Sequence, residues 1–113
     1  MGDTFSASMT EERREIDVEA FAARLEAEEV QVVDVRTDEE WREGRLPGAR
    51  HLTLNELTAA AETLDRERAV VFVCAGGNRS AMAADAFRTA GFEAYSLEGG
   101  LKAWTAGGKS LEG

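Results

Sequence analysis

The sequence has few of the side chains that build disulfides and metal sites. Its 113 residues include one cysteine, Cys74, and one histidine, His51. One cysteine excludes an internal disulfide, and one cysteine with one histidine cannot supply the ligand set of a structural zinc or a catalytic metal. We therefore expect no metal site, and any chemistry must depend on very few reactive groups.

Basic side chains are also scarce. Lysine and arginine number 13 against 22 aspartates and glutamates, which gives a net charge of −9. Such a surface repels the phosphates of nucleic acids and anionic lipids, so we expect neither as a partner. No apolar run approaches the roughly 20 residues of a membrane span, and the N-terminus lacks the pattern of a secretory signal. These absences predict a soluble, cytoplasmic protein.

The length fits one domain, and the pattern of residues suggests its boundaries. Residues 1–14 are polar and unpatterned, so we expect a flexible N-terminal arm there. Regular alternation of apolar segments and turn signals begins near residue 15 and ends near residue 108. The sequence therefore predicts an arm over 1–14, one domain over 15–108 and a C-terminal tail over 109–113.

Strand-like and helix-like segments alternate within the domain. The β-branched and apolar runs at 30–35, 69–73 and 94–97 are typical of strands buried on both faces. Between these runs, apolar residues recur at helical spacing. The expected helix starts are marked by an N-cap at Asp17 and by capping boxes at Thr37 with Glu40 and at Thr53 with Glu56. This order predicts an α/β fold with a mainly parallel sheet. At helical spacing, Trp41 and Trp104 are expected in the core.

The segment that follows the clearest strand carries the chemistry. Cys74 stands at the carboxyl end of strand 69–73, where parallel sheets bind their ligands. Gly76 and Gly77 allow a tight turn whose amides converge on one point, a helix begins after them, and Arg79 adds a positive charge that can also reach an oxyanion. These features stabilise an anionic sulfur and predict a reactive thiol. A structural cysteine is the alternative, but it requires none of these neighbours.

Five separated motifs make the sequence resemble a single-domain rhodanese over residues 15–108. They are Val33-Asp34-Val35-Arg36, Glu40-Trp41, Gly44-Arg45-Leu46-Pro47-Gly48-Ala49, the C-x-x-G-x-R-S loop from Cys74 to Ser80, and Leu97-Glu98-Gly99-Gly100 with Trp104. The resemblance implies a three-layer fold in which helices flank a mainly parallel sheet of about five strands. One departure is Arg45, where the family often has histidine.

The resemblance also implies a sulfurtransferase that works through a persulfide on Cys74. The thiolate takes the outer sulfur from a donor such as thiosulfate or a persulfide, and an acceptor such as cyanide, a thiol or a protein removes it. No cofactor is implied. The implied site is a substrate-binding loop that holds the outer sulfur, with supporting roles for Asp34 and Arg36. The loop residues are Ala75, Gly76, Gly77, Asn78, Arg79 and Ser80.

Some expectations around this site stay open in the sequence. Arg36 is expected to pair with Glu40 in a structural role, and Ser80 either caps the helix or bonds the sulfur. The loop before Arg79 carries no charge, so the donor could be a persulfide or polysulfide in place of thiosulfate. A sulfur carrier, a redox-sensing module or an interaction module is the main alternative function. Related phosphatases usually have five residues between cysteine and arginine, whereas four stand here.

Overall fold

The computed structural model describes residues 14–113, so the predicted arm lies almost entirely outside the described residues. The described part has five strands: β1 (Glu15–Ile16), β2 (Val30–Asp34), β3 (Arg50–His51), β4 (Ala69–Val73) and β5 (Ala94–Leu97). Its helices are α2 (Val18–Glu26), α3 (Asp38–Arg42), α4 (Leu57–Ala60), α5 (Asn78–Thr89) and α6 (Gly100–Ala106), with short 3₁₀ turns at Leu54–Glu56 and Ala61–Thr63.

The five strands form one parallel sheet in the order β1-β5-β4-β2-β3. The three strands predicted from apolar runs are confirmed and occupy its centre. The two edge strands, β1 and β3, contain two residues each, which is too short for a periodic pattern to reveal. The predicted α/β class and the parallel sheet of about five strands are confirmed.

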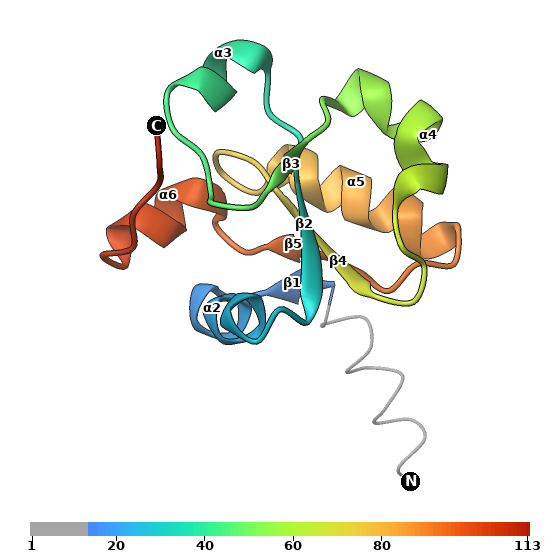
Figure 1. Cartoon of the computed structure of the whole chain (residues 1–113), viewed down its shortest axis with the longest axis horizontal. Helices are drawn as coiled ribbons and strands as arrows, with labels where there is room; N and C mark the ends of the chain where they lie inside the picture. Colours follow the sequence, from blue (N-terminus) through green and yellow to red (C-terminus); the bar gives the residue numbers. More distant parts are fainter. Residues whose placement is uncertain (1–13) are drawn as a thin grey trace, which may run out of the picture.

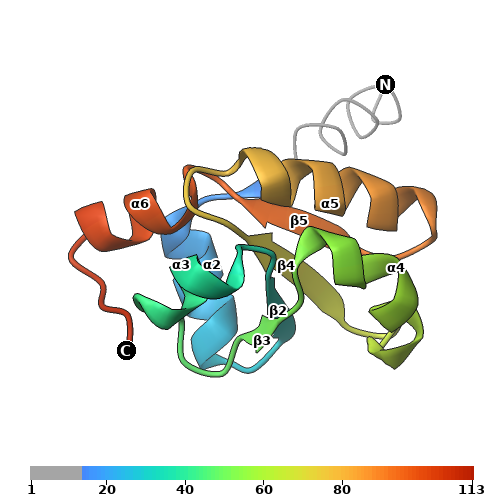
Figure 2. The same cartoon turned by 90° about the horizontal axis from the view of Figure 1, so that it is seen from above.

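Helices cover both faces of the sheet and give three layers (Figures 1 and 2). On one face, α5 and the short helices around α4 enclose an apolar cluster that includes Phe72, Phe87 and Phe92. On the other face, α2 and α6 enclose a second cluster that includes Phe21, Leu97 and Trp104. The expectation that Trp104 lies in the core is therefore confirmed.

Strand β4 lies between the two apolar clusters, and this position explains why its sequence is apolar throughout. Val70 and Phe72 face the α5 layer, while Val71 and Val73 face the α2 and α6 layer, and all four are fully buried. Alternate side chains of a strand point to opposite faces, so a strand between two helical layers must be apolar at every position. Cys74 follows as the next residue and continues the alternation toward the α5 face.

Two expectations about local structure are wrong. The segment after the Thr53–Glu56 capping box is not one helix; it consists of a 3₁₀ turn, the four-residue α4 and a second 3₁₀ turn. Trp41 is not in the core, because α3 contains only five residues and buries none of them. Its ring instead stacks on His51, with the two ring centroids 4.6 Å apart.

The chain beyond α6 packs back onto the domain. The amide of Arg45 donates to the carbonyl of Glu112 at 2.7 Å, and the amide of Glu112 donates to the carbonyl of Arg45 at 2.8 Å. Trp104 Nε1 donates to the carbonyl of Ser110 at 3.0 Å. These contacts hold the C-terminus beside α3 (Figure 1). Within residues 14–113, no helix is both long and apolar enough to cross a membrane; the cytoplasmic location stays a prediction.

Candidate active site

Cys74 lies where the loop after β4 turns into α5. Gly77 precedes the helix in a left-handed conformation, with φ at 105°, which a residue with a Cβ rarely adopts. This turn brings the first amides of α5 back toward the sulfur. The thiol is 1% exposed and stands at the carboxyl end of the central strand, as the sequence predicted.

Three groups of the loop contact the Cys74 sulfur. The amide of Gly77 donates to Sγ at 3.1 Å, the amide of Ser80 donates at 3.4 Å, and the Ser80 hydroxyl lies 3.4 Å from Sγ. Burial opposes ionisation of the thiol, but the hydrogen bonds from the Ser80 hydroxyl and from the amides of Ser80, Gly77 and Arg79 outweigh it and lower the pKa of Cys74. The loop therefore favours the thiolate.

The Ser80 hydroxyl belongs to a buried pair of serines. Its oxygen lies 2.7 Å from the hydroxyl oxygen of Ser96 on β5, and both residues are at most 1% exposed. The Ser80 hydroxyl is also 3.2 Å from the carbonyl of Gly77. The helix cap is Gly77, which has no side chain, so Ser80 contacts the sulfur and does not cap α5.

The N-terminus of α6 holds the other side of the loop. The amide of Leu101 donates to the carbonyl of Cys74 at 2.8 Å, and the amide of Lys102 donates to the carbonyl of Ala75 at 3.0 Å. Gly100 makes this approach possible, because a Cβ at its position would lie 2.5 Å from both carbonyl oxygens. With these carbonyls directed at α6, the peptide units of the loop are held in one orientation.

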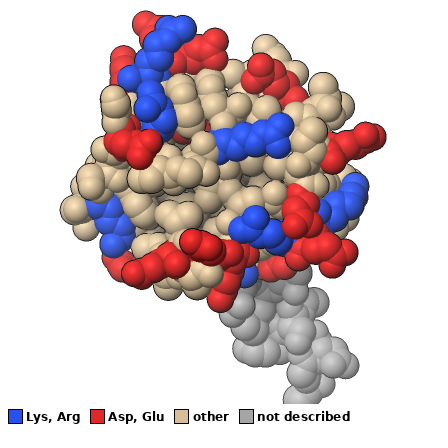
Figure 3. Space-filling view, in the orientation of Figure 1, with Lys and Arg blue, Asp and Glu red and all other residues tan. Residues whose placement is uncertain are grey.

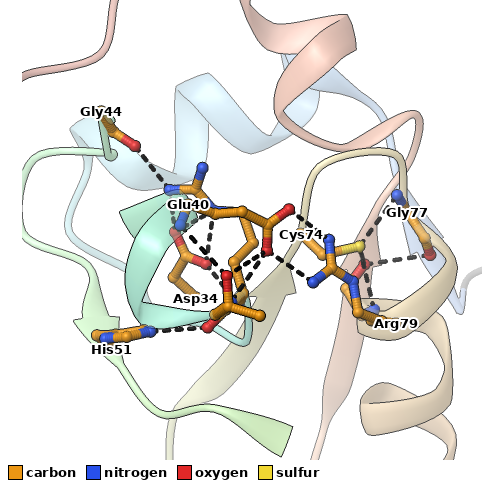
Figure 4. Close-up of polar contacts among 10 residues, drawn as sticks. Asp34, Glu40, Gly44, His51, Cys74, Gly77 and Arg79 are labelled. Carbon is orange, nitrogen blue, oxygen red and sulfur yellow. Dashed lines mark hydrogen bonds and ion pairs between the residues drawn. The ribbon is translucent and has the colours of Figure 1, made fainter. Parts of the chain in front are cut away.

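Arg79 lies beside the loop, but its charge is not free. Its guanidinium pairs with both carboxylate oxygens of Glu40 on α3, at 2.8 and 3.0 Å (Figure 4). The hydrogen bond from Arg79 is the main cause that lowers the pKa of Glu40 to about 2. Glu40 also completes the predicted capping box with Thr37, so α3 fixes the carboxylate that meets Arg79.

The predicted pairing of Arg36 with Glu40 is wrong. Arg36 makes a two-pronged contact with Asp34, with the shortest N–O distance at 2.8 Å, and its guanidinium also donates to the carbonyl of Gly44 at 2.7 Å. Residues two apart on an extended chain point to the same side, which brings these two side chains together. The pair is buried and connects the end of β2 to the end of α3, so its role is structural.

His51 packs beside the buried Asp34–Arg36 pair. Its Nε2 lies 2.7 Å from the carbonyl oxygen of Arg36, and its ring stacks on Trp41. The guanidinium of Arg45 also lies over the Trp41 ring, 5.0 Å from its centroid. Arg45 thus occupies the family's frequent histidine position as a packing residue. Among residues 14–113, no group of His, Cys, Asp and Glu could hold a metal ion.

Two residues of the site were not found by sequence reasoning. Ser96 appeared only as part of a strand, although a polar residue in a buried strand next to the cysteine strand was a usable signal. Glu40 appeared as a capping residue, in the Glu40-Trp41 motif and as a partner for Arg36, and nothing in the sequence connects it with Arg79, which lies 39 positions away. Of the predicted loop residues, Gly77 and Ser80 donate their amides to the Cys74 sulfur, whereas the Arg79 guanidinium is directed at Glu40.

Comparisons with known proteins match most of the chain. A family model described as a rhodanese-like domain matches residues 17–107. The chain is 38% identical over 94 residues to "Putative sulfurtransferase YtwF" of Bacillus subtilis, covering 82% of this chain and 91% of that protein. It is 32% identical to "Putative sulfur carrier protein YrkF" of the same organism, covering 80% of this chain and half of that protein.

A solved structure gives the same result for the fold. The crystal structure of a rhodanese-related protein from Thermoplasma volcanium superposes with a TM-score of 0.81 at 26% identity. The match covers 87% of this chain and 96% of that one.

Proposed function

The chain belongs to the rhodanese-like domain family, and from this premise we propose that it is a sulfurtransferase that carries sulfur as a persulfide on Cys74. The observation that supports the proposal best is the set of donors around the sulfur: two amides and one hydroxyl contact Sγ. They lower the pKa of the thiol and supply a nucleophile without an external base.

The first half-reaction forms a sulfur–sulfur bond at Cys74. The thiolate attacks the outer sulfur of thiosulfate, the bond between the two sulfur atoms of the donor breaks, and sulfite leaves with the electron pair. Cys74 then carries a persulfide anion. We propose that amides of the loop, from Ala75 to Ser80, hold the charge on the outer sulfur in the same way as they hold the thiolate.

The second half-reaction returns the enzyme to its first state. A thiophilic acceptor attacks the outer sulfur of the persulfide, and the Cys74 thiolate is the leaving group. Cyanide gives thiocyanate, and a thiol gives a new persulfide. Two separate transfers through a covalent intermediate predict ping-pong kinetics.

Intact mass spectrometry tests this mechanism. Wild type incubated with thiosulfate should gain the mass of one sulfur atom and should lose it again after cyanide or a dithiol is added. Cys74→Ser should gain nothing under either condition. If wild type gains no sulfur from thiosulfate, from polysulfide or from a low-molecular-weight persulfide, the proposal is wrong.

A sulfur carrier is the second candidate, because one relative is named as a sulfur carrier protein and is twice as long as the matched region. A carrier would form the same persulfide, but it would pass the sulfur slowly to cyanide and quickly to a protein. Single-turnover rates of persulfide loss with cyanide, a dithiol and a protein thiol therefore separate the two functions.

A further inference from the structure

The Glu40–Arg79 ion pair beside the Cys74 loop bears on the charge of the sulfur donor. Glu40 and Arg79 are each about one-third exposed, while the Cys74 sulfur behind them is buried. In Figure 4 the Glu40 carboxylate and the Arg79 guanidinium point toward one another from α3 and α5, beside the cysteine. Arg79 also lies within electrostatic reach of the sulfur, because the pKa of Arg79 is raised first by its hydrogen bond to Glu40 and then by Cys74.

The carboxylate of Glu40 is held in place from two sides. Arg79 contacts both of its oxygens, and the backbone amide of Thr37 donates to Oε1 at 3.0 Å. Both partners are charged near neutral pH, because the pKa of Glu40 is about 2 and arginine stays protonated. The pair therefore contributes a net charge of zero where an anionic donor arrives.

With the pair neutral, the Cys74 thiolate leaves the site with one negative charge. The rest of α3 adds two exposed carboxylates, Asp38 and Glu39, against one guanidinium, Arg42. Arg36 is buried and its charge is paired with Asp34. The face in Figure 3 carries acidic side chains around its rim together with several basic ones, and the whole chain has a net charge of −9.

We propose that Glu40 is a specificity-determining residue that directs this site toward sulfur donors with one negative charge or none, and away from the thiosulfate dianion. The donor class is a thiosulfonate, a protonated persulfide or a neutral polysulfide. The inference rests on the proposed persulfide mechanism. Each donor gives its outer sulfur to Cys74 as its sulfur–sulfur bond breaks and the leaving group keeps the electron pair. A thiosulfonate leaves as a sulfinate, a persulfide leaves as a thiolate, and the polysulfide, a hydrogen polysulfide, leaves as the shorter hydropolysulfide anion.

The experiment compares two donors that differ by one charge. Thiosulfate carries two negative charges and methanethiosulfonate carries one, and each transfers one sulfur to the thiolate. Their kcat/KM values are measured with cyanide as the acceptor for wild type, Glu40→Gln and Glu39→Gln. Glutamine at position 40 still fits a capping box, so the variant removes the charge and keeps the helix signal. Glu39→Gln removes the same charge from the exposed neighbour.

The expected result is a larger gain for the dianion. Coulomb energy scales with the charge of the donor, so Glu40→Gln should raise kcat/KM about tenfold for thiosulfate and about threefold for methanethiosulfonate. Glu39→Gln should change both by less than about twofold, because exposed charges are screened. The two leaving groups differ in reactivity, so the two donors are not compared directly. The readout is the ratio of kcat/KM for thiosulfate to kcat/KM for methanethiosulfonate, and how this ratio changes from wild type to each variant.

Each other outcome overturns the inference in a recognisable way. If Glu40→Gln changes both donors equally, or lowers both, Glu40 only positions Arg79 or supports α3. If wild type forms no persulfide with either donor, the proposed function itself fails. If Glu40→Gln does not fold, Glu40→Ala takes its place in the same comparison, and equal changes for the two donors contradict the inference.

Discussion

Two pairs of arginine and carboxylate lie near the carboxyl ends of the strands, and they differ mainly in burial. Asp34 is fully buried and the Arg36 side chain is 8% exposed, whereas Arg79 and Glu40 are about one-third exposed. A buried pair must stay closed, because a single charge without its partner has no water to solvate it. A half-open pair can exchange its partner with solvent or substrate. The same pairing of arginine with carboxylate thus forms a buried contact in one place and a partly solvated contact in the other.

The largest effect should come from breaking the buried pair. Asp34→Asn removes one charge and leaves Arg36 unpaired in the interior, which should lower the free energy of unfolding by about 3–5 kcal/mol. Glu40→Gln should lower it by only about 0–1 kcal/mol, because the pair is partly solvated. Urea denaturation of both variants measures the difference. Equal losses would show that burial does not separate the two pairs.

Two glycines near Cys74 offer a similar comparison, Gly100 at the start of α6 and Gly76 in the loop. A Cβ at Gly100 would lie 2.5 Å from the carbonyl oxygens of Cys74 and Ala75, and its φ is +64°, so Gly100→Ala should lower the free energy of unfolding by about 2–4 kcal/mol. A Cβ at Gly76 meets nothing within 4 Å. Gly76→Ala is therefore the matched control and should change the free energy by less than about 1 kcal/mol. Thermal and urea denaturation test both.

The buried part also tunes the sulfur through Ser96. When the Ser80 hydroxyl donates its single proton to the Cys74 thiolate, Ser96 must be the donor in the hydrogen bond between the two serines, and this bond strengthens Ser80 as a donor. Ser96→Ala removes this donor, which is worth about 0.5–1.5 kcal/mol, so the pKa of Cys74 should rise by about half a unit to one unit.

The rate of alkylation by iodoacetamide, measured against pH, reports this pKa. Ser96→Thr keeps a hydroxyl and should restore the profile of wild type. A profile that stays unchanged in Ser96→Ala would mean that the serine pair only fills the core. A merely structural defect would change stability without moving the midpoint of the profile.

The sequence predicted the parts of the molecule that depend on local patterns. Strand β4 is apolar at every position because helices cover both faces, and Asp17 caps α2 because its side chain accepts from the amide of Ala20 at 2.8 Å. The Cys74 loop was found for the same reason: its glycines, helix start and arginine are contiguous.

The parts that were missed depend on contacts between distant segments. Arg36 was assigned to Glu40 by helical spacing, but it precedes the helix, and the extended chain brings it to Asp34. The pairing of Glu40 with Arg79 and that of Ser80 with Ser96 join different elements, so only the arrangement of those elements in space reveals them. Local signals located Cys74 and its loop, and only the tertiary structure shows which distant side chains contact them.

The smallest expected effect is the loss, in acid, of the stability that the Glu40–Arg79 pair contributes. The pKa of Glu40 falls from 4.5 to about 2 because Arg79 bonds its carboxylate. A carboxyl group with a lowered pKa stabilises the folded state above its unfolded value and loses this contribution as the pH falls. The contribution of Glu40 should therefore be complete above about pH 5 and should decline as the pH falls toward 2.

Because the pair is partly exposed, wild type should exceed Glu40→Gln by no more than about 1 kcal/mol at pH 6, and the difference should shrink by pH 3. Urea denaturation at both pH values measures this, with Glu39→Gln as the control. A difference that stays constant or grows toward acid would mean that Arg79 does not hold the Glu40 carboxylate in solution. The Arg79 charge beside Cys74 would then be unpaired in solution. Of the two pairs compared above, only Asp34–Arg36 would exist in solution.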